Sequence, residues 1–248
     1  MANYTLEDLA KDPEFIKIIN HIIAKSYGNP KRTLIFQKVR EKIKGRTNLI
    51  EMVEACSFKL QSMRYHLVQM LQLEGDYAQK HKMLADLFVK KMGGFPGVSA
   101  LDPIEVRIEF ESFIMKTKSL LEIFSQIASS EFKNITSRFI ELDKILKQHA
   151  SKDPRAKLIS ERINEAKWIS DFESIKSHDT MRDVMTHLKT LPVRPQNLVY
   201  TKDGVNVVPS GTSHKGKNIK NVDYASSIVL EIESLIEDIL KILYDIKV

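Results

Sequence analysis

The chain has 248 residues, of which 43% are hydrophobic and 28% are charged, a composition typical of a globular protein large enough to bury a core. Its net charge of +6 is compatible with a nucleic-acid partner but is too small for a protein that coats DNA. The single cysteine, Cys56, excludes an intramolecular disulfide and argues against a thiolate metal site, and its apolar neighbours predict that it is buried.

The first residues, MANYTLEDLAKDPEF, are polar and acidic and therefore unlike a signal peptide. No apolar run approaches the ~18 residues that a membrane span requires. From these two features we expect a soluble, cytoplasmic protein without membrane segments. Only nine glycines and eight prolines occur in the chain, which favours long regular segments.

The first part of the chain predicts helices. Asp12–Pro13 and Asn29–Pro30 each place a capping residue before a proline at the first helical position, and the second of these helices should end near Gly45. Asn48 and Glu51 stand at capping-box spacing before a long amphipathic helix. The apolar side of that helix comprises Leu49, Ile50, Val53, Leu60, Met63, Leu67, Met70 and Leu71, and the pattern continues through Leu84, Leu87 and Phe88.

The segment GGFPG at residues 93–97 interrupts this pattern and is the clearest break in the chain. We therefore predict an N-terminal helical region over residues 1–97 and a helical bundle over residues 98–248. Within the bundle, Asp102–Pro103 and Asp153–Pro154 mark helix starts. Apolar residues at helical spacing predict three inward faces, formed by Val106, Phe110, Phe113, Leu120, Phe124 and Ile127, by Phe132, Ile135, Phe139, Leu142 and Leu146, and by Leu158, Ile159, Ile163, Ala166 and Ile169.

The last part of the chain changes character. A further helix, capped by Asp179 or Thr180, should end before Pro192. The stretch LVYTKDGVNVV alternates apolar residues around Asp203–Gly204, which predicts a β-hairpin, and PSGTSHKGKNIKN after it predicts a polar, basic loop. A terminal helix is expected over Tyr224–Val248. Its inward positions are Ile228, Ile232, Leu235, Ile236, Ile239, Leu243 and Ile246, and its outward acids are Glu231, Glu233, Glu237 and Asp238.

These elements predict an all-α fold, a helical bundle with an N-terminal helical extension and a small β-hairpin insert before the last helix. The chain contains no phosphate-binding glycine loop, no dinucleotide-binding fingerprint, no His-Glu-x-x-His and no nucleophile elbow. The seven histidines are scattered, with no pair at metal-ligand spacing. We therefore expect neither a metal nor a cofactor.

Several polar side chains have a structural explanation. Glu105, Glu109 and Glu111 follow a predicted helix start, where carboxylates interact favourably with the helix dipole. His66 and His81 lie among core positions of the long helix, and we interpret them as packing histidines rather than metal ligands.

One short motif remains, in the stretch MRDVMTH at residues 181–187. Arg182 is followed directly by Asp183, and His187 stands five residues after the arginine. This arrangement resembles the signature of the HEPN superfamily, in which an arginine, often followed by Asn, Asp or His, precedes a histidine by a short helical interval. The resemblance covers residues 100–248 and departs from a subset of the family at Lys189, where those proteins have tyrosine.

The resemblance implies an α-helical bundle that forms a homodimer, with two copies of the motif facing a shared cleft. Many members of the superfamily are metal-independent endoribonucleases, and others are binding or dimerisation modules without catalysis. If the chain resembles the endoribonucleases, Arg182 binds phosphate, His187 is the general base or acid, and Asp183 orients the imidazole. The implied partners are RNA, a second copy of the chain, and an antitoxin or other partner protein.

The chemistry of RNA cleavage without metal fits these residue types. Histidine titrates near pH ~6.5 and can take the proton of a 2′-hydroxyl, and arginine presents a fixed, charged fork to phosphate oxygens. Asp183 and His187, at i and i+4, share one side of a helix. Arg182 is about 140° from His187 on a straight helix, so both reach one phosphate only through a curled side chain, a distorted helix or a second subunit.

Two alternatives stay open. Met181, Val184, Met185 and Leu188 explain the same segment as an amphipathic helix whose wet side carries the polar residues, in a non-catalytic interaction or dimerisation module or a nucleotide-binding bundle. The basic loop supplies candidate RNA contacts, although a solvated loop explains its composition equally well. These candidates are Lys215, Lys217 and Lys220.

Overall fold

The computed structural model confirms the predicted all-α bundle with a small β insert before the last helix. It describes residues 30–92, 104–173, 180–181, 193–194, 197–201, 204–208, 210–214 and 217–247. The helices of this part of the chain, in order, are α3 (Pro30–Lys42), α4 (Thr47–Met92), α5 (Ile104–Ser130), α6 (Phe139–His149), α7 (Pro154–Glu165), the 3₁₀ helix η1 (Lys167–Asp171) and α9 (Asn221–Tyr244).

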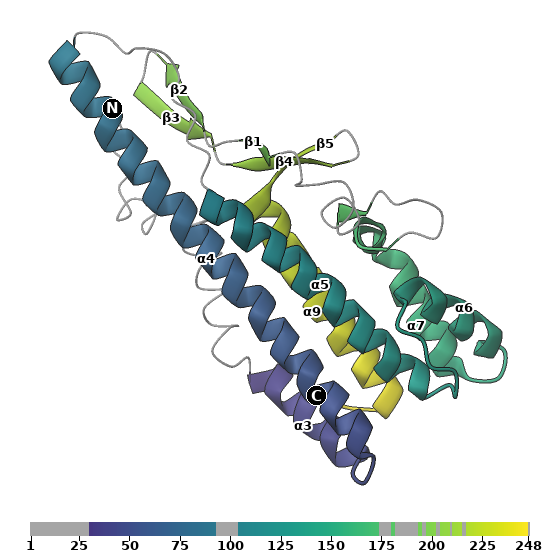
Figure 1. Ribbon diagram of the computed structural model, residues 1–248. Coiled ribbons are helices and arrows are strands. Elements are labelled where there is room, and N and C mark those ends of the chain that lie inside the picture. Colours follow the sequence, from purple (N-terminus) through teal and green to yellow (C-terminus); the bar gives the residue numbers. More distant parts are fainter. Residues whose placement is uncertain are drawn as a thin grey trace.

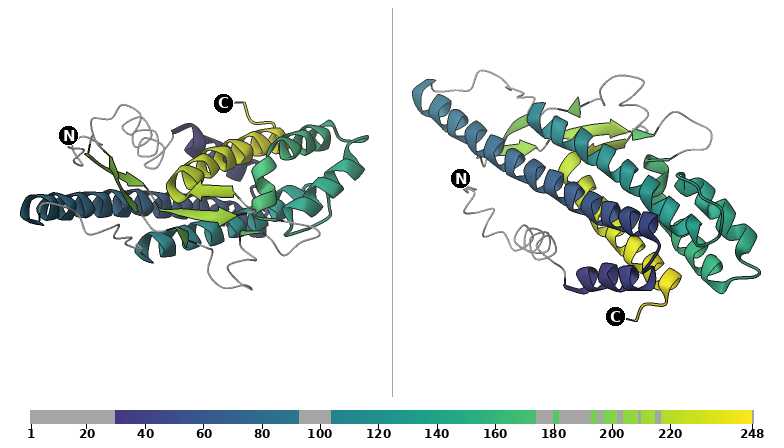
Figure 2. Two further views of the ribbon diagram at one scale, coloured as in Figure 1. Left: turned by 90° about the horizontal axis from the view of Figure 1, so that it is seen from above. Right: turned by 60° about the horizontal axis from the view of Figure 1, so that its bottom comes forward.

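The bundle is built around three long helices. Helices α4 and α5 pack along each other, and α9 packs against both of them. Figures 1 and 2 show α3 beside the end of α9, and α6 with α7 at the end of the bundle where α5 finishes. Helix α4 runs as one continuous 46-residue helix through Gly75, as its apolar periodicity predicts.

The strands form two small antiparallel sheets at the end of the bundle where α9 begins (Figure 1). Strands β2 and β3 form one sheet, and β1, β4 and β5 form the other in the order β1-β4-β5. Their bounds are β1 (Val193–Arg194), β2 (Asn197–Thr201), β3 (Gly204–Val208), β4 (Gly211–His214) and β5 (Lys217–Lys220).

The predicted hairpin is confirmed, with a shift of one residue. Thr201 pairs with Gly204, so the connection is residues 202–203 rather than Asp203–Gly204. The expected polar loop after it was wrong, because β4 and β5 form a second hairpin there. A Cβ atom at Gly211 would lie 2.6 Å from the carbonyl oxygen of Ile219, so this close strand approach requires glycine.

One hydrophobic core runs through the described helices. It includes residues of α3 and α4, such as Ile35 and Met63, together with Phe113 of α5 and Ile239 of α9. Cys56 is completely buried, as predicted, and burial raises the pKa of its thiol. Residues 93–103 lie outside the described part, so the domain boundary at residue 97 stays a prediction, while α4 and α5 on either side of it pack closely together.

The helix starts follow from local chemistry. The Asp153 carboxylate accepts a hydrogen bond from the backbone N–H of Arg155 at 2.9 Å and caps α7, as predicted. Gly45 has a φ of +93°, which suits a glycine in the turn between α3 and α4. Asn48 was wrongly predicted as the cap of α4, because the helix starts one residue earlier, at Thr47.

The chain between α5 and α6 is not helical, although Ile135 was predicted to continue a helix. Helix α5 ends at Ser130, and Lys133, with a φ of +60°, closes the turn that follows. The backbone N–H of Thr136 then donates to the Ser129 hydroxyl at 3.0 Å and holds the returning chain against α5. Ile135 therefore points outward and is 77% exposed. Leu158, also predicted to face inward, is 49% exposed on α7.

Two isoleucines test this core assignment. Ile239→Ala should lower the free energy of unfolding by about 2–5 kcal/mol, because the fully buried side chain leaves a cavity. Ile135→Ala should change it by less than about 0.5 kcal/mol, because that side chain is already in water. Chemical denaturation monitored by circular dichroism measures both, and equal losses would contradict the outward position of Ile135.

Candidate functional site

The motif itself lies outside the residues that the structure describes. This holds for Arg182, Asp183 and His187, and also for Lys215. Of the other predicted RNA contacts, Lys217 has a described backbone in β5, and the exposed Lys220 lies 3.5 Å from the Asp223 carboxylate. The structure therefore describes the surroundings of the motif rather than the motif.

The residues just before the motif belong to the core. Thr180 and Met181 are each 1% exposed. The Met181 side chain is part of the main hydrophobic cluster, which fixes the chain one residue before Arg182. The motif therefore starts from a point held inside the bundle.

A buried carboxylate holds the chain a few residues earlier. The Glu173 side chain is 2% exposed and accepts a hydrogen bond from Lys118 Nζ of α5 at 2.6 Å. Its other oxygen accepts from the backbone N–H of Ile140 in α6 at 3.0 Å. A buried charge is tolerated only when it is paired and hydrogen-bonded in this way. Glu173 thus ties the segment before the motif to two helices.

Asp171 adds a third attachment, to α9. The Tyr224 hydroxyl donates to Asp171 Oδ2 at 3.0 Å, and the Tyr224 ring packs edge-on against Phe110 of α5. Burial, followed by the nearby Asp171 charge and this hydrogen bond, raises the pKa of Tyr224 well above its usual value. The hydroxyl therefore stays protonated and acts as a donor.

Further charged groups lie on the side of α5 that carries Lys118. Arg107 and Glu111 pair at 3.2 Å, and Lys118 follows Arg107 by 11 residues, which brings it to nearly the same side of the helix. The second contact of Lys118 is Glu122, at 3.6 Å. Each of these cations has a carboxylate partner on α5, and Lys118 also reaches the segment before the motif through Glu173.

The structure also places polar groups inside the core that the sequence analysis missed. Glu233, predicted to face outward on α9, is buried and pairs with Arg64 of α4. Glu74 of α4 accepts hydrogen bonds from the backbone N–H of Ser210, at 3.1 Å, and from its hydroxyl. These contacts fasten α4 to α9 and to the start of the second sheet.

The acids at the start of α5 have structural partners, in agreement with their predicted role. Glu105 accepts from the Tyr77 hydroxyl at 2.8 Å, and Glu109 contacts His66 Nδ1 at 2.6 Å. His66 is therefore a pairing residue at the α4–α5 contact rather than a packed core histidine. Within the described ranges, no three His, Cys, Asp or Glu side chains gather closely enough to hold a metal ion.

None of the described helices combines the length and apolar character that a bilayer crossing requires. In comparisons with known proteins, no family model, curated protein or solved structure matches the chain. A function is therefore proposed from the contacts that hold the chain before the motif, which are those of Asp171, Glu173 and Met181.

The Tyr224–Asp171 contact predicts that the free energy of unfolding depends on pH in the alkaline range. The raised pKa of Tyr224 means that the folded state keeps a proton that the unfolded state releases near pH 10. The contribution of this proton to the free energy of unfolding is therefore complete below pH 10 and is lost as the pH rises above it. The loss is at most about 1.4 kcal/mol per pH unit for one group. Tyr224→Phe should therefore show a shallower alkaline decline of unfolding free energy in urea titrations than the wild type.

Tyr244 provides the internal comparison, because burial raises the pKa of its hydroxyl as well. Some alkaline sensitivity should therefore remain in Tyr224→Phe. Equal slopes for the wild type and Tyr224→Phe above pH 10 would contradict the assignment of a proton to the Asp171 contact.

Proposed function

We propose that the chain is a metal-independent endoribonuclease of the HEPN type. In this proposal Arg182 binds a phosphate of the RNA, His187 transfers the proton of the 2′-hydroxyl or of the leaving group, and Asp183 orients the imidazole. These roles rest on the sequence motif and on the chemistry of arginine and histidine.

The observation that supports the proposal most directly is that the chain before the motif is attached to three helices and to the core. Glu173 binds α5 and α6, Asp171 binds α9, and Met181 enters the core. Catalytic groups require support of this kind, because a displacement of about 1 Å can lower a rate by about 100-fold.

The proposal requires that Arg182 and His187 reach the same phosphate of the RNA. Arg182 and His187 are about 140° apart on a straight helix. A second subunit that brings its own Arg182 to the His187 of the first satisfies this demand. The ribonuclease is therefore expected to be active as a dimer and inactive when diluted to monomers.

The test is cleavage of single-stranded RNA by purified protein in the presence of EDTA. The wild type should cleave, and His187→Ala should lower the rate by about 100-fold or more, the contribution typical of a general acid or base. Arg182→Ala should lower it by a similar factor, because it removes the cation that stabilises the phosphate. Cleavage by His187→Ala at the wild-type rate would contradict the proposal.

Matched controls use residues away from the motif. His149→Ala and Arg40→Ala change the same residue types, in α6 and α3, and should leave cleavage unchanged. Glu173→Gln removes the charge that pairs with Lys118 and should lower kcat by about tenfold with little change in KM, because it disturbs the position of the motif rather than RNA binding.

A non-catalytic interaction module is the second candidate. A specific observation favours it: several large apolar side chains of α4 and α5 are exposed, although α4 and α5 lie at the centre of the bundle. Absence of cleavage, together with self-association through these side chains, would favour this candidate over the ribonuclease.

A further inference from the structure

The net positive charge of the chain is concentrated in one short segment. Residues 30–46, which form α3 and the turn into α4, contain seven of the 38 basic residues and one of the 32 acidic residues. The rest of the chain therefore has 31 of each and no net charge, although the whole chain has a charge of +6. Such a segment attracts ligands of the opposite sign. Its basic residues are Lys31, Arg32, Lys38, Arg40, Lys42, Lys44 and Arg46, and its acid is Glu41.

Two arginines of the segment are already paired with carboxylates. Arg46 Nη1 lies 2.6 Å from Glu131 Oε1, just after the end of α5, and Arg40 Nη1 lies 3.7 Å from Glu54 Oε1 of α4. These contacts hold the segment against the two central helices. Arg40 and Arg46 therefore have structural partners, and any external ligand is left to the lysines.

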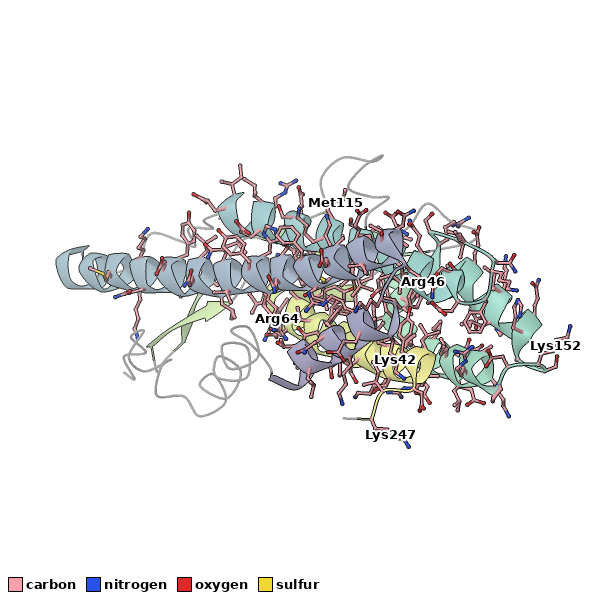
Figure 3. All side chains as sticks on the ribbon, turned by 90° about the horizontal axis from the view of Figure 1, so that it is seen from below. Lys42, Arg46, Arg64, Met115, Lys152 and Lys247 are labelled. Carbon is pink, nitrogen blue, oxygen red and sulfur yellow. The ribbon has the colours of Figure 1, made fainter. Side chains whose placement is uncertain are left out.

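Among the described residues, four lysines at the end of the bundle where α9 finishes have no carboxylate within the 4.0 Å of an ion pair. Lys38 and Lys42 are four residues apart on α3 and share one side of the helix. Lys38 Nζ donates to the backbone carbonyl of Lys247 at 2.8 Å, and Lys44 is exposed on the turn that follows α3. We call Lys38, Lys42, Lys44 and Lys247 the lysine surface. Figure 3 shows Lys42 and Lys247 where α3 lies beside the end of α9.

Two exposed acids accompany the lysine surface, and they leave it with an excess of positive charge. Glu41 Oε1 accepts a hydrogen bond from Gln37 Nε2 at 3.2 Å, on α3 itself. Asp245 follows the last residue of α9. Four lysines against these two acids make this end of the bundle basic, whereas the chain outside residues 30–46 is neutral as a whole.

The lysine surface suits the phosphate backbone of a nucleic acid. Ammonium groups contact phosphates as point charges and do not read bases. The lysine surface itself contains no aromatic ring on which a base could stack, so binding should not depend on the RNA or DNA sequence.

An anionic membrane is a poorer ligand for the same lysines. Among the described large apolar side chains of α3, Ile35, Phe36 and Val39 are buried in the core, and only Leu34 is left at the surface. A helix that binds in the membrane interface needs a whole apolar side to enter the bilayer. Helix α3 has already used its apolar side inside the protein.

We propose that the lysine surface binds the phosphate backbone of RNA, at a site separate from the motif. RNA as the ligand rests on the proposed function. The lysine surface lies beside the end of α9, whereas Asp171, before the motif, binds Tyr224 near the start of α9. Tyr224 and Tyr244 at the two ends of that helix are about 30 Å apart. Three of the four lysines also lie outside residues 100–248, the part of the chain that carries the family resemblance.

Fluorescence anisotropy tests the proposal with a labelled single-stranded RNA of about 20 nucleotides, longer than common single-strand binding sites. The RNA is 2′-O-methylated, so that no 2′-hydroxyl is left to start cleavage. Lys42→Gln/Lys44→Gln/Lys247→Gln should bind it at least about tenfold more weakly than the wild type. The plot of log affinity against log salt should be less steep by about 2 for this variant, because each lost phosphate contact removes about 0.7 from the slope.

The matched control is Lys144→Gln/Lys152→Gln/Lys157→Gln. It removes the same number of charges from exposed positions in α6, in α7 and in the turn between them, and Figure 3 shows Lys152 at the outer edge of the bundle. The control should bind RNA as the wild type does, with the same salt dependence. Equal weakening of both triple variants, with both folded by circular dichroism, would make net charge responsible and would overturn the proposal.

Binding and cleavage are measured separately, so the two proposals can fail separately. If the wild type cleaves RNA and the lysine-surface variant binds RNA as tightly as the wild type, the lysine surface is refuted and the ribonuclease stands. If the wild type binds through these lysines without cleaving, the ribonuclease is refuted and the lysine surface stands. Wild-type binding to phosphatidylserine vesicles without binding to RNA would assign the lysines to a membrane and would also overturn the proposal.

Discussion

The buried ion pair between Arg64 and Glu233 is the constraint on which the bundle depends. The Arg64 side chain is 7% exposed and that of Glu233 is 3% exposed, so both charges have been removed almost completely from water. Such removal costs several kcal/mol per ion unless the partners meet in good geometry. The pair therefore fixes how α4 lies on α9, and α5, which packs against both, completes the three-helix centre.

The helical framework could be predicted from the sequence because each long helix buries one side, and the buried side repeats with the helical period. The position of Glu233 could not be predicted in this way. A glutamate is normally solvated, and its partner lies 169 residues earlier, beyond any local pattern.

The strands after β3 were missed because their residues are polar. Gly211 was the available signal, since a glycine within a strand indicates a close backbone approach.

The candidate site was predictable only as a motif. Arg182, Asp183 and His187 were identified from their spacing, whereas the groups that hold the preceding chain come from other helices. Glu173 meets partners 55 and 33 residues away, in α5 and α6, and no sequence period connects them. What the structure adds is therefore a scaffold, in which buried paired groups and the Met181 side chain position the segment from which the motif begins.

The central claim is that the buried Arg64 and Glu233 side chains depend on each other across the α4–α9 contact, and a double-mutant cycle by urea denaturation tests it most directly. The account predicts that Arg64→Met lowers the unfolding free energy by about 3–5 kcal/mol, because it leaves the Glu233 carboxyl group in the core without its partner. Arg64→Met/Glu233→Leu should regain most of that loss in a single transition. Additive losses in the double variant, or no loss in Arg64→Met, would contradict the account.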